Sequence, residues 1–528
     1  MIARTNRDIE VARAFHDRTA HSPASVRSSG HALDWEVKPL PFKVYPDLPE
    51  VLLPTAVDPL PGDALTALAA PAPASTGPLT LGTLATVLFF SAGLTRTKTY
   101  PGGEEMRFRA APSTGALYQT EVYVVAGAVE GLGAGVYHFS PGDFRLRQLR
   151  EGDYRGALAA AAAEPELAHR PSTLVLSAIY WRNTWKYQAR AYRHLFWDSG
   201  TMLANVLAAA GLLRLAPRIL AGFVDADLGR LLGLDPAREA ALELVGLGLA
   251  ATGVGPASAR PSPVTPAGPS GAPGVPPISH PVLPLSSAEV DYPALRELHA
   301  ASMLDTPEAV QAWRQGGPLP APTPRGRTVA LPPPRPAAGR GLGETILRRA
   351  STRQFSHEPL TAVELSTALA AATAPMAADV PGPLVWLYLI VSAVEGIAPG
   401  SYAYWPGEPR LEALHAGDHR ARSAHLCLEQ PLGGDAAAVI YFLAPLDPLL
   451  GIWGNRGYRL ANLAAGLAGG RAYLAAYAQG FGASGLTFYD RDVADFFAPH
   501  AAGLDAIFVT ALGRSVRGAP RAAGLRIR

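Results

Sequence analysis

Arginine and hydroxyl residues crowd one short segment of the sequence and could together bind a phosphate. Arg349, Ser351 and Arg353 alternate within Arg348–Phe355. Guanidinium groups bind phosphate oxygens in a bidentate manner, and a nearby hydroxyl adds a further hydrogen bond. Taken alone, a solvated basic turn explains the segment more simply, so a phosphate site needs support from elsewhere in the chain.

A second segment could approach a planar ligand closely. Residues 109–118 read RAAPSTGALY and stand directly before an apolar, β-branched run at 121–126. Proline and glycine fix a tight loop, whose backbone N–H groups and small hydroxyls leave room for a ligand. Such a loop is by itself more often an ordinary turn. Its candidate ligand contacts are Pro112, Ser113, Thr114, Gly115 and Ala116.

Lysine is rare in this chain, which draws attention to the lysines that remain. The sequence has 46 basic residues, of which only Lys38, Lys43, Lys98 and Lys186 are lysines. A lysine kept where arginine is otherwise used could serve as an amine that loses its proton, which a guanidinium practically never does. Chance survival on the surface is the competing explanation for any one of them.

Composition and charge exclude several classes of function. The formal net charge is +2 and the charges are interspersed, so we expect no nucleic-acid or membrane partner. The N-terminus lacks the apolar core of a signal peptide, and we expect a soluble, cytoplasmic protein. Cys427 is the only cysteine, and the histidines lack metal-ligand spacing, so we expect neither disulfides nor a metal site.

The elements that must position these segments occur twice. Gly131 and Gly396 are 265 residues apart within matching surroundings, and Arg190-x-Tyr192-Arg193 returns 266 residues later as Arg456-x-Tyr458-Arg459. Each copy has an amphipathic helix and apolar strands, which indicates an α+β fold with helices on both sides of a sheet. Two copies of one fold in one chain imply a built-in dimer.

Segments rich in proline and glycine, at 251–284 and 315–343, separate the copies because they cannot form packed elements. The predicted organisation is an N-terminal extension at 1–30, a first domain at 31–250, a linker at 251–343 with a helical segment near 286–314, a second domain at 344–515 and a basic tail at 516–528.

Together the motifs resemble the nitroreductase superfamily of FMN enzymes, and within it the SagB-type dehydrogenases, which oxidise azolines in ribosomal peptides. The resemblance implies tandem nitroreductase-like domains, each a central, mostly antiparallel sheet flanked by helices, that form an intramolecular pseudo-dimer. The matching segments are His31–Pro46, Pro112–Tyr123, Arg349–Phe355, Gly485–Asp490 and Leu512–Arg514.

Members of this superfamily bind FMN between two subunits, and here each copy keeps a different half of the site. Copy one keeps the Pro-Ser loop but has only Arg18–Ser22 where an arginine motif would stand. Copy two keeps the arginine motif but reads APMAAD at 374–379 instead of a Pro-Ser loop. The resemblance therefore implies about one FMN per chain and a vestigial second site. The implied FMN contacts are Arg349, Ser351, Arg353, the loop at 112–116, the amides of Gly485 and Leu486 near the flavin N5, and Arg514 at the phosphate.

The resemblance also implies a catalytic pair, Lys186 and Tyr187, which copy two replaces with Ile452 and Trp453. We expect Tyr187 to be the base and Lys186 its partner, because an ammonium lowers the pKa of a neighbouring phenol and burial lowers that of lysine. Lys186 as the base stays open. Arg190, Tyr192 and Arg193 occur in both copies, so we expect a structural role for them.

The implied function is oxidation of a thiazoline or oxazoline to the azole in a peptide natural product, with hydride transfer to FMN and reoxidation by dioxygen. An NAD(P)H-dependent nitro-, quinone or ene-reductase on the same fold is an alternative. A second alternative is a flavin-binding scaffold that recruits a cyclodehydratase or a leader-peptide-binding protein. The partners expected are a peptide or small heterocyclic substrate, and the internal pseudo-dimer allows a monomer.

Overall fold

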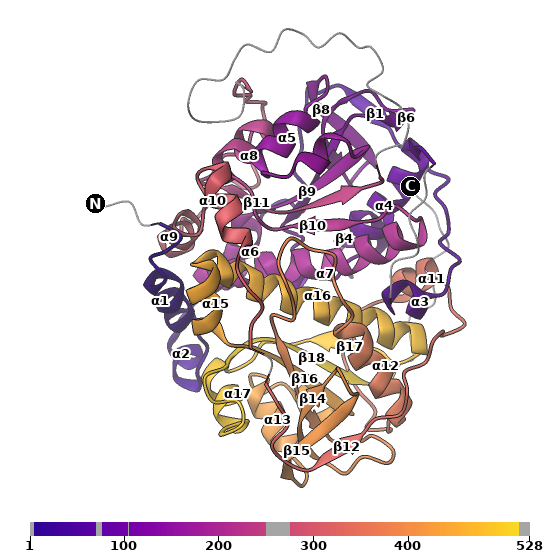
Figure 1. Ribbon diagram of the computed structural model, residues 1–528, viewed down its shortest axis with the longest axis vertical. Helices are drawn as coiled ribbons and strands as arrows, with labels where there is room; N and C mark the ends of the chain where they lie inside the picture. Colours follow the sequence, from indigo (N-terminus) through magenta and orange to yellow (C-terminus); the bar gives the residue numbers. More distant parts are fainter. Residues whose placement is uncertain (1–4, 70–76, 104, 250–274, 321, 517–528) are drawn as a thin grey trace.

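Two seven-stranded sheets with the same strand order form the frame of the protein (Figure 1). The computed structural model describes residues 5–69, 77–103, 105–249, 275–320 and 322–516. The first sheet has the order β1-β8-β7-β5-β9-β11-β10 and the second β12-β15-β14-β13-β16-β18-β17, and neighbouring strands are antiparallel. The first sheet comprises β1 (Glu50–Leu52), β5 (Thr120–Ala126), β7 (Gly135–Ser140), β8 (Arg145–Glu151), β9 (Ser172–Ile179), β10 (Arg218–Leu220) and β11 (Glu239–Leu247). The second comprises β12 (Thr328–Ala330), β13 (Trp386–Val391), β14 (Gly400–Trp405), β15 (Arg410–Ala416), β16 (Ala438–Ala444), β17 (Gly482–Gly485) and β18 (Asp505–Gly513).

Helices cover both faces of each sheet, which explains why central strands such as β5 and β9 are buried along their whole length. Two short ladders, β2 (Leu79–Thr80) with β6 (Val129–Glu130) and β3 (Leu94–Thr99) with β4 (Glu105–Arg109), complete the strands. The helices are α1 (Glu10–Arg18), α2 (Pro23–Ser28), α3 (Ala64–Ala69), α4 (Leu81–Ala92), α5 (Arg155–Ala161), α6 (Tyr180–Tyr187), α7 (Ala191–Leu212), α8 (Asp225–Leu232), α9 (Pro293–Ala301), α10 (Pro307–Arg314), α11 (Leu342–Arg348), α12 (Ala362–Ala372), α13 (Arg420–Leu426), α14 (Pro431–Asp435), α15 (Leu446–Trp453), α16 (Arg456–Gln479) and α17 (Asp490–Phe496).

The long helices α7 and α16 join the two copies at the centre of the molecule (Figure 1). They cross at Gly200 and Gly466, which are equivalent in the repeat. A Cβ added at Gly200 would lie 2.5 Å from the carbonyl oxygen of Leu463, and one at Gly466 would lie 2.4 Å from that of Trp197. Two bare glycines therefore allow the backbones to touch.

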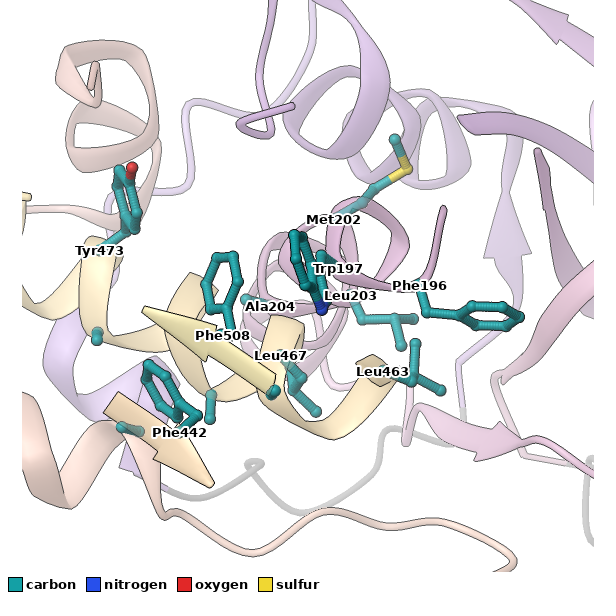
Figure 2. Packing of buried hydrophobic residues seen from close by; sticks show 14 of the residues in the cluster. Phe196, Trp197, Met202, Leu203, Ala204, Phe442, Leu463, Leu467, Tyr473 and Phe508 are labelled. Carbon is teal, nitrogen blue, oxygen red and sulfur yellow. The ribbon is translucent and has the colours of Figure 1, made fainter. Parts of the chain in front are cut away.

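Trp197 is the main side chain at this crossing. Its indole nitrogen donates to Asn462 at 2.8 Å, and its ring lies 5.4 Å from that of Phe508. Figure 2 shows Trp197 of the first copy among Phe508, Leu467 and Leu463 of the second. The two copies therefore share one continuous hydrophobic core.

Two clusters of ion pairs, related by the pseudo-twofold symmetry of the repeat, connect the copies. Arg190 and Arg193 of the first copy pair with Asp490 of the second. Arg456 and Arg459 of the second pair with Asp225 of the first, at 2.6 and 2.8 Å. All of these side chains are buried, and each aspartate is the first residue of its helix, where the helix dipole favours a negative charge. The repeated arginines thus have the structural role that we expected.

Segments outside the two predicted domains also pack on the core. The linker contains the predicted helical segment as α9 and α10. It also contains β12, which pairs with β15, so the second sheet begins earlier than the boundary at 344 places it. The tail from 517 onwards lies outside the described residues. None of the helices in the described ranges combines the length and the apolar character that a membrane crossing requires.

Candidate active site

The Pro-Ser loop lies between β4 and β5, where it forms a tight turn held by one aspartate. Gly115 has a φ of +64°, which suits glycine. The Ser113 and Thr114 hydroxyls donate to the carboxylate of Asp198 at 2.5 and 2.7 Å, and the Thr114 amide donates to it at 2.9 Å. Burial raises the pKa of Asp198 to about 6 despite these hydrogen bonds. The loop hydroxyls, which we expected to face a ligand, are thus used within the protein.

Arg349 connects the arginine motif of the second copy to this loop of the first. Its guanidinium donates to the carbonyl oxygens of Ala110 at 2.9 Å and Arg109 at 3.3 Å. Burial lowers its pKa. The two half-motifs, which are about 240 residues apart in the sequence, are therefore in direct contact, with Arg349 as the link.

Ser351 and Gly485 meet through a tyrosine of α16. The Ser351 and Tyr473 hydroxyls are 3.4 Å apart, and the Gly485 amide donates to the Tyr473 hydroxyl. The Leu486 amide donates to the carbonyl of Val509 at 3.1 Å. Both amides that we expected near a flavin N5 are thus hydrogen-bonded to protein acceptors, although Gly485 itself is exposed.

Arg353 lies beside Lys186, so the site also collects positive charge from both copies. Burial first, and the Arg353 charge second, lower the pKa of Lys186. Within the described ranges, neither side chain has a hydrogen bond or a carboxylate partner. The Lys186 ammonium lies 5.5 Å from the centre of the Tyr187 ring, and Arg353 is exposed. This pair of unneutralised cations attracts an anion.

The surroundings of Tyr187 change its expected role. Burial and the Asp198 carboxylate raise its pKa, and the positive charge of Arg353 offsets them only in part. The expectation of a lowered phenol pKa is therefore wrong, because burial outweighs the neighbouring charge. A Cβ added at Gly115 would lie 2.9 Å from the Tyr187 hydroxyl, so the absent side chain admits the phenol. Tyr187 is a protonated hydrogen-bond donor at neutral pH.

Arg514 pairs with a carboxylate of the protein, although we expected it at a phosphate. It forms an ion pair at 2.8 Å with Glu364, whose carboxylate also completes the capping box of α12 with Thr361. The carbonyl of Arg514 accepts from the amide of Ser356, directly after the arginine motif. Arg514 thus lies next to the motif, but its charge is neutralised by Glu364.

The structure corrects the location of the missing arginine motif in copy one. Asp63 and Gly341 form a β-bridge directly before α3 and α11, so α3 is the counterpart of α11. The counterpart of the Arg349 segment is therefore at 70–76, which reads APAPAST and lies outside the described residues. Arg18–Ser22 lies at the end of α1 instead, where the His21 amide donates to Asp490 at 2.7 Å. The correct segment also has no arginine, so the asymmetry between the copies persists.

Protein atoms fill the place of the second site. Ile219 of β10 is the counterpart of Gly485, since it pairs with Val245 as Gly485 pairs with Thr510. Its amide donates to the Ala377 carbonyl at 2.8 Å, and its own carbonyl accepts from Asp379 at 3.1 Å. The segment that replaces the Pro-Ser loop therefore takes up the edge of β10.

The linker helix α10 also packs at this edge of β10. Arg314 donates to Asp379 at 2.9 Å, and the indole of Trp313 donates to the carbonyl of Trp453 at 3.0 Å. A Cβ on Gly222 would lie 2.8 Å from the Trp313 ring, so this ring fills the space directly above the backbone. Trp453 is the counterpart of Tyr187. The second position therefore lacks a Lys-Tyr pair, and the Trp313 ring fills the space beside Gly222.

The composite position fits a flavin mononucleotide better than its counterpart does. It offers two cations without carboxylate partners, Arg353 and Lys186, and two glycines, Gly115 and Gly485, at its edges. At the counterpart, the 377–379 segment bonds to the edge of β10, and the carboxylate of Asp379 accepts from the amides of Ala221 and Gly222. An anionic, planar cofactor therefore fits the composite position better than it fits the edge of β10.

The fold and the duplicated site define the class of the protein: the chain belongs to the Nitroreductase family, whose sequence profile matches residues 67–249 and 346–512. A protein named for the nitroreductases, MJ1384 of Methanocaldococcus jannaschii, is 31% identical over 156 residues, which cover 29% of this chain and 75% of that protein.

Two further relatives extend the comparison. The trifolitoxin-processing protein TfxB of Rhizobium leguminosarum bv. trifolii is 29% identical over 171 residues, which cover 31% of this chain and 46% of that protein. A crystal structure of a nitroreductase-type protein from Anabaena variabilis is 26% identical, with a TM-score of 0.74, and the match covers 96% of this chain and 99% of that one. The tandem arrangement thus occurs in a solved structure.

Proposed function

We propose that this protein is an FMN-dependent oxidase of the SagB type, which oxidises an azoline to an azole in a peptide natural product. The observation that carries the proposal is Lys186, a half-buried amine beside Arg353 at the junction of the two half-motifs, whose pKa is lowered. The likeness to TfxB, a protein named for processing trifolitoxin, supports a peptide substrate. The other three lysines have different surroundings. Lys43 is held in a buried ion pair with Glu239 at 2.6 Å, Lys98 is exposed, and Lys38 lies over the exposed ring of Trp35.

In this proposal Lys186 is the base and Tyr187 its hydrogen-bonding partner. Aromatisation of an azoline removes a proton from one ring carbon and a hydride from its neighbour, so a neutral amine is needed beside the ring. Burial and the adjacent Arg353 favour the neutral amine. The Tyr187 phenol, which stays protonated, can donate a hydrogen bond to the heteroatom of the ring and so orient it. Flavin mononucleotide, when bound, would supply the hydride acceptor, and dioxygen would take the electrons and become peroxide.

The proposed cofactor contacts come from both half-motifs. Arg353 and Ser351 are the proposed contacts to the anionic parts of FMN, with Gly115 and Gly485 as close backbone approaches. Arg349 is proposed to hold the Pro-Ser loop on the arginine motif. About one FMN per chain is expected, because α10 and the 377–379 segment fill the second position. A cyclodehydratase or a leader-peptide-binding protein is the proposed partner, and the cytoplasm the proposed location.

Oxidation of a synthetic thiazoline peptide tests the proposal. The purified flavoprotein should convert the peptide to a product that has lost two hydrogens, with one peroxide formed per product and no added NAD(P)H. Lys186→Ala should lower this rate about a hundredfold or more, as loss of a general base does. Lys98→Ala, at an exposed lysine, is the matched control and should retain full activity.

The alternatives predict other results. The likeness to MJ1384 favours a reductase. In a reductase, NADPH would rapidly bleach the bound flavin under anaerobic conditions, and the thiazoline would stay unchanged. If the protein is a scaffold, the activity of its peptide-modifying partner would be the same with Lys186→Ala as with the wild type. Either outcome would reject the oxidase.

A further inference from the structure

The second copy contains a large cavity that the flavin site does not use. Its volume is about 890 Å³, and its lining is mostly apolar, with an aromatic wall formed by Trp386, Tyr404 and Trp405. This volume is within the range of pockets that hold small organic ligands, roughly 300–1,000 Å³. The cavity lies between the starts of β13 and β15 and the middle of α16.

Comparison of the two copies explains why the cavity is open. Residues 93–119 lie between α4 and β5, whereas only 373–385 lie between the equivalent α12 and β13. In the first copy the longer connection brings Arg109 into this region, where it is fully buried between Phe42 and Tyr118. The shorter connection of the second copy, residues 373–385, contains neither an arginine nor an aromatic residue.

Arg471 gives the cavity a charge that its counterpart lacks. With the 266-residue offset it replaces Asn205, a buried amide that donates to the carbonyl of Phe90 at 2.8 Å. Arg471 is only 7% exposed and donates to the carbonyls of Ala374 and Pro375, at 2.5 and 3.2 Å. Within the described ranges it has no carboxylate partner, and burial lowers its pKa to about 10.

A buried cation without a counter-ion is costly unless an anion joins it. The other charged residues of the wall, Glu408 and Arg410, pair with each other and leave Arg471 as the unneutralised charge. From these residues we propose that the cavity is a second binding site, for a small organic carboxylate with an aromatic or otherwise apolar body. The carboxylate pairs with Arg471, and the apolar body packs on Trp386, Tyr404 and Trp405.

Titration calorimetry with 2-naphthoate and with its neutral analogue 2-naphthylmethanol tests this proposal on the flavin-loaded full chain. The wild type should bind one naphthoate and bind the alcohol at least tenfold more weakly. Arg471→Asn, which installs the residue of the first copy, should weaken naphthoate roughly ten- to a hundredfold and leave the alcohol unchanged. Arg422→Gln, at an exposed arginine away from the cavity, is the control for loss of one positive charge and should bind as the wild type does.

Ala468→Phe provides a second, independent variant, because Ala468 lines the cavity one helical turn before Arg471, and a phenyl ring there blocks the space beside the guanidinium. It should abolish binding of both compounds while the flavin content stays at the wild-type level. The site is refuted if the wild type binds no naphthoate at millimolar concentration, or binds acid and alcohol equally. Undiminished binding to Ala468→Phe would mean that naphthoate binds outside this cavity, and this also overturns the proposal. None of these results depends on the azoline activity.

Discussion

Removal of Asp225, one of the two aspartates that join the copies, should destabilise the whole protein. Asp225 accepts hydrogen bonds from Arg456 and Arg459 of the other copy and from the amide of Leu304 at 3.0 Å. Asp225→Asn leaves two buried guanidinium groups without their counter-charge. Loss of one partner of a buried ion pair costs about 3–5 kcal/mol, so we expect the free energy of unfolding to fall by that amount.

Guanidinium-induced unfolding followed by tryptophan fluorescence measures this loss. Asp291→Asn is the matched control, because Asp291 pairs with Arg296 at the surface and should contribute less than about 1 kcal/mol. Burial alone would raise the pKa of Asp225, but Arg456 and Arg459 hold it at about 2. The stability from Asp225 is therefore complete above about pH 4 and is lost as the pH falls towards 2. Equal effects of the two variants at pH 7 would refute the reasoning.

Three further predictions concern other parts of the molecule. Burial raises the pKa of Glu243 to about 8, so the native state keeps a proton that the unfolded chain releases, and stability falls as the pH rises from about 4.5 to 8. Glu243→Gln should therefore stabilise the protein in thermal unfolding by a few kcal/mol at pH 8 and by little at pH 4.5; equal shifts at both values would contradict this. Gly466→Ala should unfold at a clearly lower temperature, whereas Gly451→Ala, at an open helical position, should not, and equal melting temperatures would exclude the close helix crossing. The Arg353→Gln variant, assayed with excess FMN, should shift the ascending limb of the pH–rate profile to higher pH, since removal of a like charge raises the pKa of Lys186. An unchanged profile would mean that the charge of Arg353 does not influence Lys186.

The sequence predicted the architecture well because a repeat constrains it strongly. The constant offset between Arg190 and Arg456 required equivalent helices, and the structure has them as α7 and α16 with an identical strand order around them. The complementary loss of half-motifs predicted that Arg349 and the Pro-Ser loop would meet, and they are in contact. Such relations can be predicted from the sequence because comparison of the two copies shows which motif each copy keeps and which it loses.

The remaining features depend on long-range packing. Asp198 and Tyr473 hold the two half-motifs, but in the sequence they are single polar residues on apolar helices. The raised pKa of Tyr187 follows from burial, which no local pattern reveals. Residue type alone misplaces the missing motif at Arg18–Ser22, because the place of the motif is set by the helix α3 before it. The segment that follows α3 is 70–76.

The number of flavins per chain tests the central claim that two half-sites make one composite site. The cofactor should be released by heat, identified chromatographically and counted against protein after reconstitution with excess FMN. We predict about one FMN per chain, and little in Arg353→Ala, whereas Asp379→Ala at the blocked position should retain about one. Two FMN per chain, or full occupancy in Arg353→Ala, would contradict the composite site.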